Sequence, residues 1–295
     1  MNTDVRTAEA VVSEANRVHG LRFRLERRFD EGMQSGAWLL SETSTGRRAV
    51  LKWSASRSWT ERTGQAARAV SKIRAAGYPT PQWLAVGTSA SGYGYLVQEF
   101  TAGRSPDRVG AAEARLLVGL LETHAGLDPD PGRCWSRLVH EQTADRRDGL
   151  WQRAAATGAT GRALVDVCGR LLAAHGPVEL PTGDLVHGDF RPANILLDAG
   201  RVAGVVDIEA LGSGTRAFDY ATLLSAEGLT PDAVRTLRRA GEQVAGPGVL
   251  ACCYAHVALD LTVFVHRHRL ARGIRHTRTL LDRARLLLDH ADGGA

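Results

Sequence analysis

The residues from 185 to 209 carry the side chains in this chain that are best suited to catalysis. Two short apolar runs, rich in β-branched residues and joined by a four-residue turn, predict a β-hairpin here. Asn194 and Asp207 would lie at the open end of that hairpin, where both side chains can bind one cation. Mg²⁺ prefers such oxygen ligands and takes water and phosphate at its other positions. Asp189, on the loop that enters the hairpin, could accept the proton of a substrate hydroxyl beside the metal.

His187, Asp189 and Asn194 have the spacing His-x-Asp-x-x-x-x-Asn, and Asp207 follows on a predicted strand. This order of residues is used in phosphoryl transfer. On these residues the chain resembles the aminoglycoside phosphotransferase family of antibiotic and small-molecule kinases, which has a protein-kinase-like fold. Residues 186–194 are similar to the catalytic loop of that family, and Asp207 is similar to its metal-binding aspartate.

Three other segments extend the resemblance over most of the chain. Residues 218–221 are similar to the Asp-Leu-Ala element that follows the metal-binding aspartate in the family. Residues 77–81 resemble its Pro-x-Pro turn, and residues 97–103 resemble the hinge between its two lobes. The segments occur in the order that the family requires, which makes the resemblance specific.

The resemblance implies a role for each matching residue. Asp189 is expected to be the catalytic residue that accepts or orients the hydroxyl proton, and Asn194 and Asp207 are expected to bind Mg²⁺. Lys52, at the end of an apolar strand, would contact the α- and β-phosphates of ATP, with GTP as the alternative nucleotide. Other nucleotide contacts are expected from backbone groups of the turn residues Gly32, Ser35 and Gly36 and of the hinge residues Gln98, Glu99 and Phe100.

Supporting roles are expected for His187, Glu209 and Asp219. His187 would be part of the scaffold, and Asp219 would brace the catalytic loop through hydrogen bonds. Glu209 would lie on the same face of a strand as Asp207 and so add a second metal or water-bridged contact, or else be a plain surface charge.

The ionic partner of Lys52 is left open by the sequence. Kinase-like folds usually hold this lysine with a glutamate of the following helix. Glu61 is the first candidate here, and the uncharged Gln65 lies one turn later on the same face. Lysine occurs only at Lys52 and Lys72 in a chain whose other basic residues are arginines, so its retention at position 52 supports a function there.

The elements that would position these residues change in character near residue 100. We expect an α+β protein of the kinase-like class, with a small β-rich N-terminal nucleotide-binding lobe over residues 1–100 and a hinge at about 98–103. Residues 104–295 would form a larger α-helical lobe with the catalytic and acceptor-binding residues. Apolar spacing predicts helices at 5–20, 60–76, 111–124, 162–174 and 249–290, and strands within 23–53, 82–86 and 95–100.

The composition is that of a globular protein. The chain has 295 residues, of which 44% are hydrophobic and 23% charged, so disorder and fibrous structure are excluded. The net charge is +5 and the pI is near 9.3, but the sequence contains no nucleic-acid-binding motif. The arginines from 267 to 285 are expected on a solvated helix face. No nucleic-acid partner is therefore expected, although a basic nucleic-acid binder is an alternative class.

Location and assembly are predicted only broadly. No apolar run approaches the roughly 18 residues of a membrane span, and the N-terminus does not resemble a signal peptide. The four cysteines lack metal-ligand spacing and are expected as reduced thiols. We expect a cytoplasmic monomer or homodimer without a membrane partner.

The acceptor is expected to be a small hydroxylated molecule. Gly188 stands where protein kinases have the arginine that receives an activation-loop phosphate, and only twelve positions separate Asp207 from Asp219, too few for a peptide platform. An antibiotic is favoured: an aminoglycoside, a macrolide or a basic cyclic peptide such as a tuberactinomycin. The alternatives are a metabolic kinase of homoserine, choline or a sugar, and a nucleotide-binding pseudokinase scaffold. Carboxylates that could bind a cationic acceptor are Asp128, Asp130, Glu141, Asp145, Asp148, Glu227 and Asp260.

Overall fold

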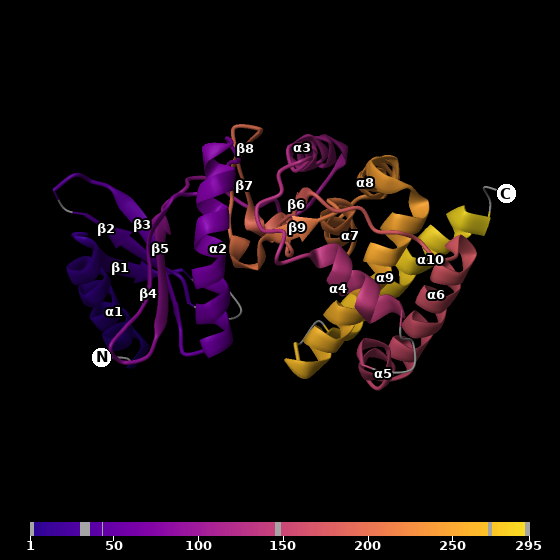
Figure 1. Ribbon diagram of the computed structural model, residues 1–295, viewed down its shortest axis with the longest axis horizontal. Helices are drawn as coiled ribbons and strands as arrows, with labels where there is room; N and C mark the ends of the chain where they lie inside the picture. The colour runs from indigo at the N-terminus through magenta and orange to yellow at the C-terminus, as the bar shows by residue number, and fades with distance from the viewer. Residues whose placement is uncertain (1–2, 30–35, 43, 145–148, 271–272, 293–295) are drawn as a thin grey trace. The chain divides into compact units, whose positions relative to one another are not determined.

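The computed structural model describes residues 3–29, 36–42, 44–144, 149–270 and 273–292. The chain forms two compact units (Figure 1). One unit consists of Met1–Arg104 together with Leu196–Ala210, and the other of Ser105–Ile195 together with Leu211–Ala295. Residues 196–210 thus belong to the same unit as the N-terminal hundred residues, although they follow the predicted catalytic loop (residues 186–194) in the chain.

The first unit is built on an antiparallel five-stranded sheet with the strand order β1-β2-β3-β5-β4. The central strand β3 pairs with β2 on one side and β5 on the other, and most of its residues are buried or half-buried. The strands are β1 Arg24–Arg28, β2 Trp38–Ser41, β3 Arg48–Ser54, β4 Trp83–Thr88 and β5 Gly94–Glu99.

Two helices cover this sheet, α1 Thr3–His19 and α2 Arg57–Ala75 (Figure 1). The apolar side of α1 packs on the sheet face that includes Ala49 and Leu51 of β3. Because side chains alternate along a strand, Lys52 points to the opposite face. Helix α2 begins at an N-cap, Ser56, whose side chain accepts a hydrogen bond from the Trp59 N–H, which explains why it starts three residues before the predicted 60.

The predicted hairpin is present as β7 Ile195–Asp198 and β8 Arg201–Val205. Its turn is shorter than expected, because Ala199 and Gly200, both with positive φ, make the connection in two residues.

Hydrogen bonds hold the hairpin within the first unit. Leu197 and Arg104 exchange two backbone hydrogen bonds of 2.9 Å, and the Val205 N–H donates to the Pro79 carbonyl at 2.7 Å. Gly103 has a φ of 136° and passes so close to the hairpin that a Cβ there would lie 3.0 Å from the Leu197 oxygen. Pro79, Gly103 and Arg104 therefore hold β7 and β8, the hairpin that leads to Asp207, within the first unit.

The second unit is mainly helical and also contains a two-stranded sheet of β6 Asp184–Val186 and β9 Gly212–Gly214. Strand β6 leads into the catalytic loop, which ends in the short helix η1 Pro192–Asn194. The helices are α3 Ala111–Glu122, α4 Trp135–Ala144, α5 Leu150–Ala155, α6 Ala159–His175, α7 Ala217–Leu224, α8 Pro231–Ala245, α9 Pro247–Arg267 and α10 Gly273–Asp292.

Helix α9 corrects one expectation from the sequence. Its 21 residues are long and apolar enough to cross a membrane, contrary to the prediction that no segment is. The reason for this composition lies in its packing, because 72% of its most apolar window is buried inside the protein. It contacts α6, α7, α8 and α10, and the Tyr254 hydroxyl donates to the Leu280 carbonyl of α10 at 3.0 Å. Helix α9 is thus the core helix of the second unit.

Candidate active site

Lys52 forms two ion pairs in the first unit. Its Nζ lies 2.5 Å from Asp207 Oδ1 and 2.7 Å from Glu209 Oε1. The residue is only 8% exposed. Burial by itself lowers the pKa of Lys52, but the carboxylates of Glu209 and Asp207 outweigh it and raise the pKa above its ordinary value. The amine is therefore a fixed positive charge among oxygen atoms.

Asp207 and Glu209 reach Lys52 in a way that differs from the expectation. The sequence argument put both on one face of a strand, which is wrong, because β8 ends at Val205. Asp207 has a φ of 59°, in the left-handed region that aspartate tolerates better than most residues, and Glu209 lies on the short helix η2 Ile208–Ala210. The backbone turn, and not strand alternation, brings both carboxylates to the amine.

Helix α2 does not bring Glu61 or Gln65 to Lys52. The Glu61 carboxylate accepts a hydrogen bond of 2.8 Å from Arg57 Nε on the same helix, and Gln65 is exposed. Among the described residues, the carboxylates that contact Lys52 are those of Asp207 and Glu209.

The hinge residues lie at the end of β5, where their backbone is largely engaged. The Glu99 N–H donates to the Gln82 carbonyl at 2.8 Å, and the Phe100 N–H donates to the Arg48 carbonyl at 3.2 Å. Gln98 is buried in the sheet between its neighbours β3 and β4.

The glycine turn is described only in part. Gly32 and Ser35 lie outside the described residues. At Gly36 the Arg28 guanidinium occupies the space where a Cβ would lie, so a larger residue here would displace the end of that side chain.

The predicted catalytic loop follows β6 in the second unit. Asn194 Nδ2 donates to both the backbone oxygen and Oδ2 of Asp189, at 2.8 Å and 3.0 Å. Arg191 Nη2 lies 3.0 Å from the same Oδ2. One carboxylate oxygen of Asp189 is thus held by two donors, which fixes the orientation of the side chain.

His187 is fully buried beside this loop. Its Nδ1 accepts a hydrogen bond of 3.2 Å from the Asp189 N–H, and its ring packs edge-on against Phe190. These contacts position the backbone of Asp189 and place the imidazole away from solvent.

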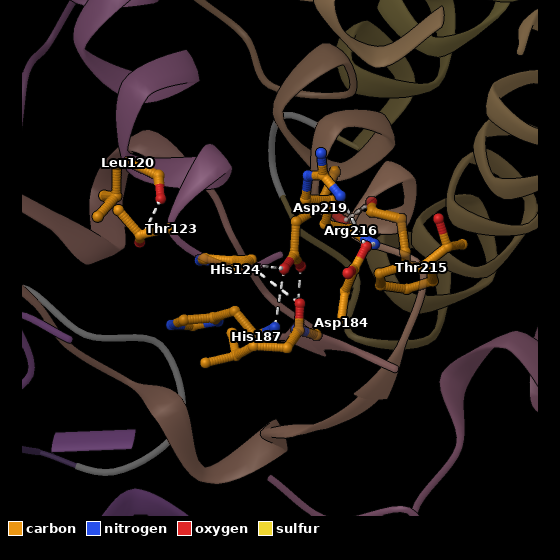
Figure 2. Close-up of polar contacts among 12 residues, drawn as sticks. Leu120, Thr123, His124, Asp184, His187, Thr215, Arg216 and Asp219 are labelled. Atoms are coloured by element: carbon orange, nitrogen blue, oxygen red, sulfur yellow. Dashed lines mark hydrogen bonds and ion pairs between the residues drawn. The ribbon is translucent and has the colours of Figure 1, made fainter. Parts of the chain in front are cut away.

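Asp219, on α7, holds the start of the loop from inside the protein (Figure 2). Its carboxylate accepts hydrogen bonds from the His187 N–H at 2.8 Å and from the Gly188 N–H at 3.1 Å. Gly188 has a φ of 82°, a conformation that favours glycine. The backbone conformation therefore explains why glycine, and not the arginine of protein kinases, occupies position 188.

Two residues near the loop were missed by the sequence analysis. Arg191 lies between the positions of the motif and is not part of it. Its positive charge, two residues after Asp189, does indicate a possible partner for that carboxylate. His124 follows α3, and its Nδ1 lies 3.2 Å from Asp219 Oδ2 (Figure 2). Nothing in the local sequence distinguishes this histidine, because its partner is distant in the chain.

A second polar network joins α3, β6 and α7. Arg216 donates to Glu122 Oε2 and to Asp184 Oδ2, each at 3.0 Å, and the Tyr220 hydroxyl donates to Glu122 Oε1 at 2.9 Å. Burial, together with the hydrogen bond to Glu122, raises the pKa of Tyr220. This network connects the elements that carry His124 and Asp219, and Figure 2 shows Arg216 and Asp184 beside them.

The second unit supplies a carboxylate held in place at a loop with an adjacent amide, and the first unit supplies a buried lysine with two carboxylates. Such groups can bind phosphate and a divalent cation and can accept a proton. Asn194 belongs to the second unit and Asp207 to the first, so their joint binding of one metal ion stays a prediction.

The comparisons with known proteins agree with the resemblance seen in the sequence. A family model described as the phosphotransferase enzyme family (APH) matches residues 26–254. No relative was found among curated protein sequences.

Solved structures of antibiotic phosphotransferases share the fold. Aminoglycoside phosphotransferase APH(4)-Ia aligns with a TM-score of 0.68 and 18% identity, over 98% of this chain and 99% of that one. Macrolide 2'-phosphotransferase MphH from Brachybacterium faecium has a TM-score of 0.61 and 17% identity, over 92% and 97%. Spectinomycin phosphotransferase APH(9)-Ia, solved with ADP and spectinomycin, has a TM-score of 0.61 and 11% identity, over 94% and 97%.

These structural similarities confirm the predicted α+β, kinase-like fold class. The family match spans more than half of the chain, and its range includes the predicted catalytic loop, Lys52 and Asp207. The chain belongs to the phosphotransferase enzyme family.

Proposed function

We propose that this protein transfers the γ-phosphoryl group of ATP to a hydroxyl group of a small-molecule antibiotic and so confers resistance. The observation that carries the proposal is the arrangement at Asp189, whose carboxylate is held by Asn194 and Arg191 on a loop that resembles the family's catalytic loop in sequence and lies within the residues that the family model matches. Phosphoryl transfer depends mainly on positioning and charge neutralisation, and a carboxylate fixed in this way is suited to orient a hydroxyl.

The chain offers suitable ligands for Mg²⁺. Asn194 uses its Nδ2 to hold Asp189, which leaves its amide oxygen as the atom that can bind a cation. Asp207 provides a carboxylate on a side chain that is 46% exposed. A bound Mg²⁺ would neutralise charge on the nucleotide phosphates, and an amide and a carboxylate oxygen are the hard ligands that it prefers.

Lys52 is the proposed contact for the nucleotide phosphates. Its charge is secured by two carboxylates. A compact ammonium on a rigid central strand suits such a contact, since it can approach phosphate oxygens as a point charge. The N–H groups of Glu99 and Phe100 already have partners, so adenine recognition by the hinge would use other backbone groups of residues 98–103.

Charged groups of the second unit support a basic acceptor. Glu227 lies on the connection between α7 and α8, and its Oε1 is 3.8 Å from His276 Nδ1 of α10. Burial lowers the pKa of His276, and the nearby charge of Arg191 lowers it further while Glu227 opposes the shift. Burial therefore favours the neutral imidazole, and the Glu227 carboxylate lies beside it, while Arg191 is close enough for its charge to act on His276.

We place Glu227 in the acceptor-binding region and propose that it attracts an amino group of the acceptor. Aminoglycosides, macrolides and tuberactinomycins all combine hydroxyl and amino groups.

The four cysteines are free thiols, which supports a reducing, cytoplasmic location.

The test is a screen of the purified protein with radiolabelled ATP and Mg²⁺ against a panel of aminoglycosides, macrolides and basic cyclic peptides. We expect one class to receive label and to be tolerated better by a sensitive host that expresses the protein. Raising the salt concentration should increase the KM of that acceptor more than the KM of ATP, because partly exposed charges are screened.

The screen also includes homoserine, choline and sugars. Phosphorylation of one of these and of no antibiotic would replace the resistance function with that of a metabolic kinase. Nucleotide binding without transfer to any acceptor would point instead to a pseudokinase.

A further inference from the structure

The two carboxylates at Lys52 differ in their surroundings. The Asp207 side chain is 46% exposed, whereas the Glu209 side chain is 12% exposed. Glu209 lies on η2, which packs against α2. Asp207 is therefore accessible to a bound ligand, and Glu209 is enclosed within the unit beside the amine.

The Lys52 ammonium needs a carboxylate that stays in contact with it when a cation binds to Asp207. If Asp207 turns toward Mg²⁺, as the proposed function requires, one ion pair of Lys52 is weakened. A buried amine without a partner is costly, because removing one member of a buried ion pair leaves the other charge uncompensated. Glu209, at 2.7 Å from Nζ, can keep the amine charged and in place at that moment.

We infer that Glu209 is the positioning residue of Lys52 and not a metal ligand. It takes the role that the sequence led us to seek on helix α2, where Glu61 is held by Arg57 instead. Helix α2 still contributes, because it packs against η2 and so supports the backbone of Glu209. The inference rests on the proposed function for the role of Lys52 at the phosphates, but the contact between Glu209 and Lys52 can be tested without substrate.

The first experiment observes the amine directly. The chain has two lysines, so protein labelled with ¹⁵N-lysine gives at most two side-chain ammonium signals in NMR spectra. Lys52 is buried and ion-paired and should give a protected signal, whereas Lys72 is exposed and serves as the internal reference. Glu209→Gln should shift or remove the Lys52 signal, and Glu61→Gln should leave it unchanged.

The second experiment measures the Kd of ADP with Mg²⁺ and with EDTA. Glu209→Gln should raise this Kd about tenfold under both conditions, because the defect is in the lysine and not in the metal. Asp207→Ala should abolish only the gain in affinity that Mg²⁺ brings. In the double variant with Lys52→Met, Glu209→Gln should add nothing to the effect of Lys52→Met alone.

The outcomes separate the alternatives. An effect of Glu209→Gln on ADP binding only in the presence of Mg²⁺ would make Glu209 a metal ligand and overturn the inference. An unchanged Lys52 signal in Glu209→Gln, or a change in Glu61→Gln, would overturn it as well. If Glu209→Gln does not fold, Glu209→Asp, which keeps the charge at a shorter reach, should retain part of the ADP affinity. Failure of the wild-type protein to bind ADP would contradict the proposed function, while the NMR result would still decide the contact.

Discussion

His124 Nδ1 lies 3.2 Å from Asp219 Oδ2, and both side chains are completely shielded from solvent. The same carboxylate accepts the backbone N–H groups of His187 and Gly188, so one buried aspartate connects the end of α3 to the start of the catalytic loop. His124 is fixed on its other side as well, since its carbonyl accepts a hydrogen bond from the Leu185 N–H of β6. The position of Asp189 thus depends on contacts that lie entirely inside the second unit.

Replacing Asp219 should destabilise the protein strongly. Asp219→Ala removes the acceptor of two backbone N–H groups and the partner of His124, so the free energy of unfolding should fall by about 3–5 kcal/mol. His124→Ala removes only one contact of the carboxylate and should cost about 1–3 kcal/mol. Urea unfolding of both variants measures the difference. Equal effects would show that the backbone hydrogen bonds to Asp219 contribute little.

Asp189→Ala should separate catalysis from nucleotide binding. The side chain is proposed to act on the acceptor hydroxyl, so kcat should fall by about 10²–10⁴-fold while the Kd of ADP remains nearly the same. Steady-state kinetics and calorimetric titration with ADP check the two parts. Normal turnover by this variant would remove Asp189 from the catalytic role.

Lys52→Arg should reduce activity although the charge is retained. The amine is held between Asp207 and Glu209 at 2.5 Å and 2.7 Å in a buried position, and the larger planar guanidinium cannot occupy the same place. We expect a clear loss of kcat/KM for ATP with a nearly normal circular dichroism spectrum. Full activity would mean that Lys52 has no specific contact with the phosphates.

Glu227→Gln should affect the acceptor and not the nucleotide. The loss of this negative charge should raise the KM of an amine-bearing acceptor about tenfold at low salt and leave the KM of ATP unchanged. The same acceptor with its amino groups acetylated provides the control, because its KM should be equal in the wild type and the variant. A parallel rise for both forms would show that the effect of Glu227 is structural.

His256 should make stability depend on pH. This residue of α9 is 4% exposed, its Nδ1 has no hydrogen-bond partner, and burial lowers its pKa from 6.5 to about 4. Between these two values the unfolded chain binds a proton that the folded protein does not. Stability from this group is therefore complete above pH 6.5 and declines by about 3 kcal/mol as the pH falls toward 4.

The variant His256→Leu tests this dependence, since it replaces the imidazole by an apolar side chain of similar size that cannot bind a proton. Its free energy of unfolding should fall less steeply between pH 6.5 and pH 4 than that of the wild type, as measured by urea unfolding across this range. Identical slopes would mean that other groups dominate the acid response.

Local patterns were sufficient for most elements of the fold. Helix α2 differs from its predicted bounds by three residues at one end and one at the other, and the hairpin of β7 and β8 was located by its apolar runs. These features follow from spacing within short windows, where side-chain periodicity and turn residues act directly.

The parts that could not be predicted depend on tertiary contacts. Strand alternation was the only available argument for the positions of Asp207 and Glu209. Alternation cannot predict the left-handed backbone conformation at Asp207. The partner of Lys52 was sought on the nearest helix, because a local pattern cannot indicate a glutamate that lies 157 positions away. The buried contact between His124 and Asp219 was missed for the same reason.

The division of the first unit into two chain segments has a consequence for synthesis on the ribosome. The five strands of its sheet are complete once Glu99 has emerged, but Asp207 and Glu209 appear more than a hundred residues later. During that interval the nascent sheet contains a lysine whose native counter-charges do not yet exist. The packing around Lys52 is therefore completed only after residues 105–195 of the second unit have been translated, so the first unit finishes its own core late in synthesis.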